Sequence, residues 1–160
     1  MSNIIKAYNL AAKAHLNQKR NDGEDYINHP IRVALRCIES ISADYDLWSD
    51  IPEVISRDVQ VALMHDVVEN TSVTIGDIIN EGFSAYVVDL LITLTRSKKI
   101  TYSQYISDII WGNSYPVSAC TIKIADIADN YPTATDSMKK RYDKALNKLN
   151  EYMGSDLTVL

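Results

Sequence analysis

The chain has 160 residues, of which 46% are hydrophobic and 23% charged, with only five Gly and four Pro. This length and composition fit one domain with a packed core and regular secondary structure, and they exclude disordered and fibrous proteins. The formal net charge of −5 disfavours DNA-binding and RNA-binding proteins, which usually carry a basic excess.

The N-terminal segment predicts an amphipathic helix. Apolar residues recur at helical spacing from Ile4 to Ala12, and Ser2 is a suitable N-cap. The segment lacks the pattern of a signal peptide, and no apolar run approaches the roughly 20 residues of a membrane-spanning helix, so we expect a cytoplasmic protein without a membrane partner. A turn, NDGED, follows, and Pro30 suits the first position of a second helix, IRVALRCIES.

The middle of the chain predicts further helices. A polar connection, SADYDLWSDIPE, leads to a helix that begins after Ser56 and carries the stretch ALMHDVVENT. Thr74 and Asp77 have the spacing of a capping box for a short helix, TIGDIIN. Glu81 and Gly82 end that helix, and FSAYVVDLLITLTR predicts the next one. The β-branched runs VTI and VVDLLITL would also suit strands, but nothing at hairpin spacing pairs with them.

Three signals predict the helices of the C-terminal part. Thr101 caps SQYISDIIW, Pro116 opens VSACTIKIADIADN, and MKKRYDKALNKLNEYM forms an amphipathic last helix. The chain shows no linker and no repeat, so we predict a single all-α domain over residues 1–160. Cys37 and Cys120 have neither zinc-site nor redox-motif spacing, and we expect them to be buried thiols.

Residues with metal-ligand chemistry interrupt the apolar helices at three places. His29 lies directly before the second helix, His65–Asp66 lies in ALMHDVVENT, and Asp126 lies in KIADIADN. Each of these residues alone is more often a packed or capping residue than a ligand. Together they are harder to dismiss, because an unpaired carboxylate in an apolar helix is costly and a metal relieves that cost. Imidazoles and carboxylates from separate helices of a bundle suit a divalent metal, so we predict a site made of these four residues.

The spacing within ALMHDVVENT places a second polar layer near the predicted ligands. His65 and Glu69 lie four residues apart and would share a face of one continuous helix. Asp66 and Asn70 have the same spacing. The neighbours His65 and Asp66 diverge by about 100° on a helix, so they can bind one ion only where the helix meets its partners end-on or obliquely. We expect Glu69 and Asn70 beside a bound water and a phosphate.

These segments give the chain a resemblance to a known family. The order H…HD…D resembles the HD superfamily of metal-dependent phosphohydrolases. The stretches AHLNQKRNDGEDYINHPIRVA, ALMHDVVENT and KIADIADN are similar to the hydrolase domain of the RelA/SpoT family and to its small stand-alone relatives, the alarmone hydrolases. GFSAYVVDLLITLTR and ITYSQYI look more like small bacterial and phage members than like the long bifunctional enzymes. The similarity runs from about Tyr8 to the last helix.

The resemblance implies a fold, a cofactor and a reaction. The fold is an all-α HD bundle, and the cofactor is a divalent metal, usually Mn²⁺, with Fe²⁺ and Zn²⁺ as alternatives. The reaction is removal of the 3′-diphosphate from guanosine tetra- or pentaphosphate. The family's ligands match the four predicted residues, and Glu69 matches its acidic residue beside the attacking water. Asn130 matches a residue that contacts the nucleotide, and Arg20 matches the arginine that packs on the base.

The proposed leaving group is highly charged, so cations should surround it. Candidates are Lys123, which lies three residues before Asp126, and the cluster that contains Arg96 and Lys98. Arg20 is suited to stacking on a purine because its guanidinium is planar and weakly hydrated. Tyr26 belongs to the same expected wall.

Two positions depart from the family pattern. Relatives usually carry Glu–Asp where this chain has Glu69–Asn70, and asparagine keeps the hydrogen-bonding shape but loses the charge. Asn21 stands beside Arg20 where relatives often have another cation. Two alternatives therefore accompany the alarmone hydrolase: an HD phosphatase or phosphodiesterase for another nucleotide, and a weakly active nucleotide-binding or protein-binding module.

Overall fold

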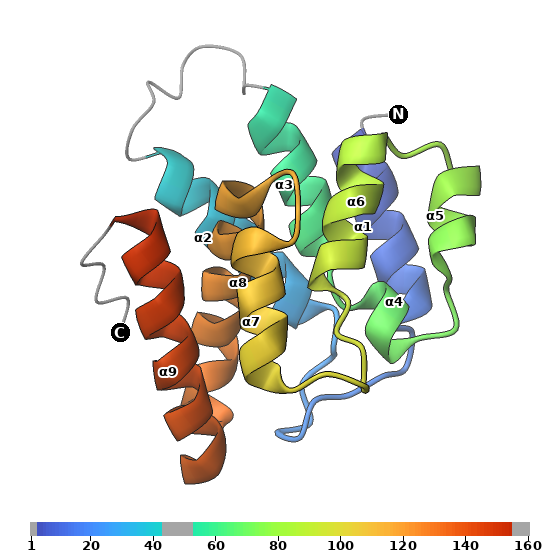
Figure 1. Ribbon diagram of the computed structural model, residues 1–160. Helices are drawn as coiled ribbons and strands as arrows, with labels where there is room; N and C mark the ends of the chain where they lie inside the picture. Colours follow the sequence, from blue (N-terminus) through green and yellow to red (C-terminus); the bar gives the residue numbers. More distant parts are fainter. Residues whose placement is uncertain (1–2, 43–52, 155–160) are drawn as a thin grey trace.

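The structure, a computed structural model, describes residues 3–42 and 53–154, and within these ranges every element longer than an isolated bridge is helical (Figure 1). The predicted all-α class is confirmed, and the segments VTI and VVDLLITL are not strands. The predicted N-cap Ser2 and residues 43–52 of the predicted polar connection lie outside the described ranges.

The helices follow one another along the chain with short connections. They are α1 Asn3–Ala14, α2 Asn28–Ser42, α3 Glu53–Met64, α4 Val67–Asn70, α5 Ile75–Asn80, α6 Ala85–Leu94, α7 Tyr102–Trp111, α8 Pro116–Asn130, the 3-10 turn η1 Tyr131–Thr133 and α9 Asp136–Met153.

Local sequence signals set several helix starts as predicted. The Thr74 side chain accepts from the N–H of Asp77, whose carboxylate accepts from the N–H of Thr74, and this capping box starts α5. Thr101 and Gln104 form the same reciprocal pair at the start of α7. Pro116 is the first residue of α8, where a missing N–H costs no helical hydrogen bond.

Several helix starts differ from the predicted ones. α6 begins two residues after Phe83, and α9 begins two residues before Met138. α2 begins at Asn28, so Pro30 is its third residue and not its first. A proline is tolerated at the third position because the first N–H groups of a helix have no carbonyl partner within the helix. α3 begins at Glu53 and not after Ser56. The Glu53 carboxylate stabilises this start because it lies at the positive, N-terminal end of the helix dipole.

The predicted helix through ALMHDVVENT is interrupted at its polar residues. α3 ends at Met64, residues 65 and 66 form a turn, and α4 covers only Val67–Asn70. The expectation of one continuous helix is therefore wrong. The interruption resolves the geometric difficulty with His65 and Asp66, because adjacent side chains at a junction between helices need not diverge as they do within one.

α3 is the central helix of the bundle. It packs against α1, α2, α6 and α8. Its buried residues occupy all its faces, including the consecutive run Asp58–Met64, as expected for a core helix. α8 also packs against α2, α7 and α9, whereas α5 and α9 lie at opposite edges of the bundle (Figure 1). The contact of α2, α3 and α8 therefore brings the three predicted ligand segments together.

Two further expectations concern cysteine and membrane insertion. Cys37 and Cys120 are buried and free, as predicted. Among the residues whose structure is described, no helix has both the length and the apolar character needed to cross a membrane.

We expect Thr101→Ala to lower the free energy of unfolding by about 1 kcal/mol, because the α7 capping box loses its hydroxyl acceptor. Chemical denaturation of the purified protein measures this change. Thr93→Ala is the matched control, since Thr93 lies inside α6 and its hydroxyl bonds only to the Asp89 carbonyl. Equal losses in the two variants would contradict the role of the cap.

Candidate metal centre

The structure brings the four predicted ligands to one point. The Nε2 atom of His29 lies 3.3 Å from that of His65 and 3.3 Å from Oδ1 of Asp126. Asp66 approaches both imidazoles, with Oδ2 lying 3.5 Å from His29 Nε2 and Oδ1 lying 3.5 Å from His65 Nε2. The distance between His65 Nε2 and Asp126 Oδ1 is 3.6 Å. The donors come from α2, the α3–α4 turn and α8.

The hydrogen bonds behind the two imidazoles determine which nitrogen faces the centre. His65 Nδ1 lies 2.8 Å from the carbonyl oxygen of Ala62, so it must carry a proton. His29 Nδ1 lies 2.7 Å from a carboxylate oxygen of Asp129 and donates to it. In the neutral rings, both Nε2 atoms are therefore bare acceptors that face each other and two carboxylates. Such an arrangement requires a cation, either a proton or a metal.

The spacing of the donor atoms fits a single divalent metal. Ligand atoms bound at about 2.1 Å lie about 3.0 Å apart around an octahedral ion and about 3.4 Å apart around a tetrahedral one. The observed separations of 3.3–3.6 Å are close to these values. Ligand atoms of His29, His65 and Asp66 also lie within 4.8 Å of one another as a group. Two nitrogens and two carboxylates are a donor set that Mn²⁺, Fe²⁺ and Zn²⁺ accept.

Asp129 supports the centre from behind, and the sequence analysis missed it. It holds His29, and its carboxylate also accepts from Arg32, with an Nε–Oδ1 distance of 2.6 Å. Arg32 in turn pairs with Glu24 at 2.7 Å. A carboxylate on the far nitrogen fixes the tautomer and orientation of a metal-binding imidazole. The signal was present in KIADIADN, because Asp129 follows Asp126 by three residues and shares its helix face.

Asn70 reaches the centre through Tyr26. The Tyr26 hydroxyl donates to Asp66 Oδ2 at 2.6 Å and accepts from the Asn70 amide at 3.0 Å. The Tyr26 ring stacks on His15 with 4.6 Å between ring centroids, and His15 Nδ1 bonds Gln18 at 2.7 Å. Because the Asn70 amide nitrogen can only donate, the Tyr26 hydroxyl accepts from it and donates its own proton to the predicted ligand Asp66.

Two other predicted residues contact Asp126, and a third, Arg20, reaches it through Asn130. Lys123 Nζ lies 2.6 Å from Asp126 Oδ2, and the Asn130 amide donates to Oδ1 at 2.6 Å. Arg20 donates to Asn130 at 3.1 Å and lies 3.7 Å from Asp129. Arg20 is therefore joined to the centre by polar contacts, with only 10% of its side chain exposed.

A cavity of about 390 Å³ opens onto these residues, a size typical of small-molecule sites. Its polar wall contains Glu69, Asn70, Lys123 and Asn130. The residues that line it are Tyr26, His65, Asp66, Glu69, Asn70, Leu94, Tyr105, Ile122, Lys123, Asp126, Asn130, Met138 and Tyr142. The candidate metal centre thus opens onto a pocket that has both charged and apolar surfaces.

The structure does not place three predicted cations in the wall of this cavity. Arg20, Arg96 and Lys98 are not among its lining residues. The Arg96 guanidinium donates to the carbonyl of Ile100 at 3.2 Å, while its backbone N–H donates to Glu69 Oε2 at 3.0 Å. Lys98 is exposed on the connection between α6 and α7. Arg96 therefore positions Glu69 through its backbone.

The electrostatics of the centre favour bound positive charge. Burial opposes protonation of His29, but hydrogen bonds to Asp126, Asp129 and Asp66 raise its pKa to about 10. Burial also opposes ionisation of Asp126, but Lys123 and the imidazoles hold its pKa well below its usual range. Without a metal, the cluster keeps a proton where a metal ion would otherwise bind.

Comparison with known proteins places this geometry in context. The family model described as "HD domain" matches residues 7–141. A protein of Aquifex aeolicus named guanosine-3′,5′-bis(diphosphate) 3′-pyrophosphohydrolase is 32% identical over 134 residues, which cover 81% of this chain. A protein of Borreliella burgdorferi with the same name is 30% identical over 148 residues, or 88% of this chain. The aligned regions span only 17% and 20% of the lengths of these relatives.

A solved structure has the same fold. It is described as "A metazoan ortholog of SpoT hydrolyzes ppGpp and plays a role in starvation responses", and it superposes with a TM-score of 0.69. The match covers 96% of this chain and 86% of the solved chain at 24% sequence identity.

We expect the metal-free protein to lose stability as the pH rises from about 6.5 to about 10. The pKa of His29 is raised from 6.5 to about 10 in the folded state. The stability gained from its proton is therefore fully present below pH 6.5, falls as the unfolded chain releases that proton above this pH, and is lost when the folded protein releases it near pH 10. Thermal melting in a series of buffers measures the effect. His29→Gln should reduce the slope and leave the part due to His65, whose pKa burial lowers but Asp66 and Asp126 raise overall. His15→Gln is the control, because burial lowers the pKa of His15 and moves its titration below this range. A wild-type slope retained in His29→Gln would contradict the assignment.

Proposed function

This chain belongs to the HD-domain family, and on that premise we propose that it is a metal-dependent phosphohydrolase that removes the 3′-diphosphate from guanosine tetra- or pentaphosphate. The observation that carries the proposal is the meeting of two imidazole Nε2 atoms and two carboxylates at the wall of a nucleotide-sized cavity. The substrate is proposed from the relatives of Aquifex aeolicus and Borreliella burgdorferi, which are named for this reaction. Residues 1–160 would act as a single catalytic domain.

His29, His65, Asp66 and Asp126 would hold the metal, and we propose Mn²⁺ as the ion. When bound, such an ion polarises a phosphoryl oxygen and lowers the pKa of a bound water. The chain itself fixes the ligand orientations beforehand. Asp129 holds one imidazole, the Ala62 carbonyl holds the other, and Tyr26 holds one oxygen of Asp66.

Glu69 would orient the attacking water and accept its proton. Its carboxylate lines the cavity, and the backbone N–H of Arg96 donates to one of its oxygens. This neutral donor fixes the position of the carboxylate without neutralising its charge. Lys123 would offset the negative charge that a phosphoryl group brings close to Asp126, from which Nζ is only 2.6 Å away.

Asn130 would contact the nucleotide, because it lines the cavity. Arg20 does not line the cavity but donates to the side-chain oxygen of Asn130, so it would position Asn130, and its stacking on the base stays a prediction. Arg96 and Lys98 stay predictions as contacts to the phosphates, since both side chains lie outside the cavity wall in the described structure.

Purified protein with Mn²⁺ should convert guanosine tetraphosphate to guanosine diphosphate and inorganic diphosphate, and His65→Ala should abolish the reaction. The reason is that His65 supplies one of the two bare nitrogens at the centre. Product analysis by ion-exchange chromatography distinguishes diphosphate from orthophosphate. Circular dichroism checks that the variant remains folded.

The substrate and the chemistry can fail separately in this assay. Turnover of another nucleotide but not of the tetraphosphate would contradict the substrate and support a different HD phosphohydrolase. Tight binding of the tetraphosphate without any product, in the presence of Mn²⁺, would contradict hydrolysis itself and support a binding module.

Asn70→Asp should raise kcat by about a hundredfold if the second carboxylate of the family pattern acts as a general base on water, at the low end of the range usual for such a group. Aspartate cannot donate to Tyr26, so it would accept the tyrosine proton in competition with Asp66. Parallel measurement of Mn²⁺ affinity separates the two effects. A lower kcat at saturating Mn²⁺ would mean that this chain relies on the asparagine amide.

A further inference from the structure

A second cavity lies between α7 and α9, next to the metal-centre cavity. Its volume is about 540 Å³, which is larger than that of the first cavity. Tyr102 forms part of its wall, and Lys123, which lines the first cavity, has its Nζ atom 6.0 Å from the centre of the Tyr102 ring. The two cavities are therefore neighbours that share this region of α7, but they have different lining residues.

The α7–α9 cavity concentrates positive charge in an acidic chain. Lys140, Arg141, Lys144 and Lys148 line it, and it has no acidic lining residue. None of these four cations forms a salt bridge with a carboxylate of the described ranges 3–42 and 53–154. The whole chain carries a formal net charge of −5, so this uncompensated cluster opposes the general charge of the protein.

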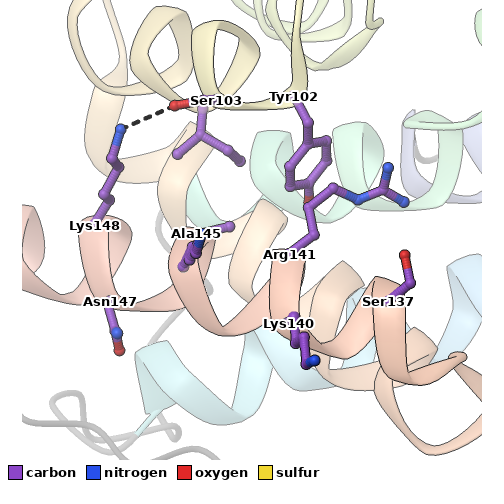
Figure 2. A pocket seen from close by; sticks show the side chains of 10 residues that line it. Tyr102, Ser103, Ser137, Lys140, Arg141, Ala145, Asn147 and Lys148 are labelled. Atoms are coloured by element: carbon purple, nitrogen blue, oxygen red, sulfur yellow. Dashed lines mark hydrogen bonds between the residues drawn. The ribbon is translucent and has the colours of Figure 1, made fainter.

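The cations are arranged along one stretch of α9. Lys140, Lys144 and Lys148 follow one another at intervals of four residues, so they share a side of the helix over about 12 Å. Figure 2 shows Lys148 joined to Ser103 at one end of the cavity and Arg141 beside Tyr102 at the other. The cations can therefore contact more than one charged group of the same ligand.

The remaining lining residues supply hydrogen bonds and an apolar wall. Ser103, Ser137 and Asn147 have side chains that can donate to an anion. Ile106 and Ala145 are buried and form apolar surface between the polar groups. A cavity of this size that is rich in donors and free of carboxylates suits a compact, acceptor-rich anion.

We propose that the α7–α9 cavity binds a small anion with at least two phosphoryl groups, such as inorganic diphosphate or the diphosphate of a nucleotide, at a site separate from the metal centre. A nucleic acid fits less well, because the cations span only about two turns of one helix and the rest of the chain is acidic. The inference goes beyond the proposed hydrolysis and does not depend on it.

Calorimetric titration of the metal-free full-length protein with inorganic diphosphate tests this site without turnover. We expect one diphosphate per chain, and at least tenfold weaker binding in the double variant Lys144→Ala/Lys148→Ala. Alanine preserves the helix, and both lysines are exposed, so the variant should fold. The charge-matched control is Lys13→Ala/Lys139→Ala, which removes two lysines that do not line the cavity. His65→Ala should leave the affinity unchanged.

Further ligands identify what the cavity recognises. Guanosine diphosphate and inorganic diphosphate should both bind, and tighter binding of the nucleotide would assign the apolar wall to the base. Orthophosphate should bind at least tenfold more weakly than diphosphate.

Four results would overturn the proposal: no diphosphate binding at millimolar concentration, equal weakening in the two double variants, loss of binding in His65→Ala but not in Lys144→Ala/Lys148→Ala, or binding of an RNA oligonucleotide but not of diphosphate.

Discussion

The Nε2 atoms of His29 and His65 lie 3.3 Å apart in the core of this protein, and the rest of the site is built around the cation that they require, either a proton or a metal ion. Both Nε2 atoms face this point because the other nitrogen of each ring donates to a fixed acceptor, a backbone carbonyl for His65 and Asp129 for His29. Two aspartates complete the cluster, and their negative charge favours a bound cation at this point.

The fold supplies this cluster by interrupting a helix. A continuous helix would point His65 and Asp66 in different directions, but the turn between α3 and α4 lets both reach the same point. The central position of α3 then brings this turn against α2 and α8, which carry the other two predicted ligands, His29 and Asp126. The contacts of Lys123 and Asn130 with Asp126 continue the same network to the cavity wall. The packing of the core and the geometry of the candidate metal centre therefore both depend on α2, the α3–α4 turn and α8.

Much of this arrangement could be predicted from the sequence, because the signals are local. Periodicity and capping residues located the helices, and the capping box at Thr74 is present as predicted. The break after Met64 could not be predicted, since nothing in an apolar run such as VALM marks a helix end, and the turn depends on tertiary packing. Asp129 was overlooked although its spacing from Asp126 was visible. The positions of Arg96 and Lys98 outside the cavity depend on how one connection folds, which charge patterning does not specify.

The most direct test of the central claim is the location of bound Mn²⁺ by anomalous diffraction from crystals grown with the ion. The account predicts one strong peak per chain, within about 2.3 Å of His29 Nε2, His65 Nε2 and oxygens of Asp66 and Asp126. A peak elsewhere on the chain, or no peak at saturating Mn²⁺ with the four side chains unchanged, would contradict it.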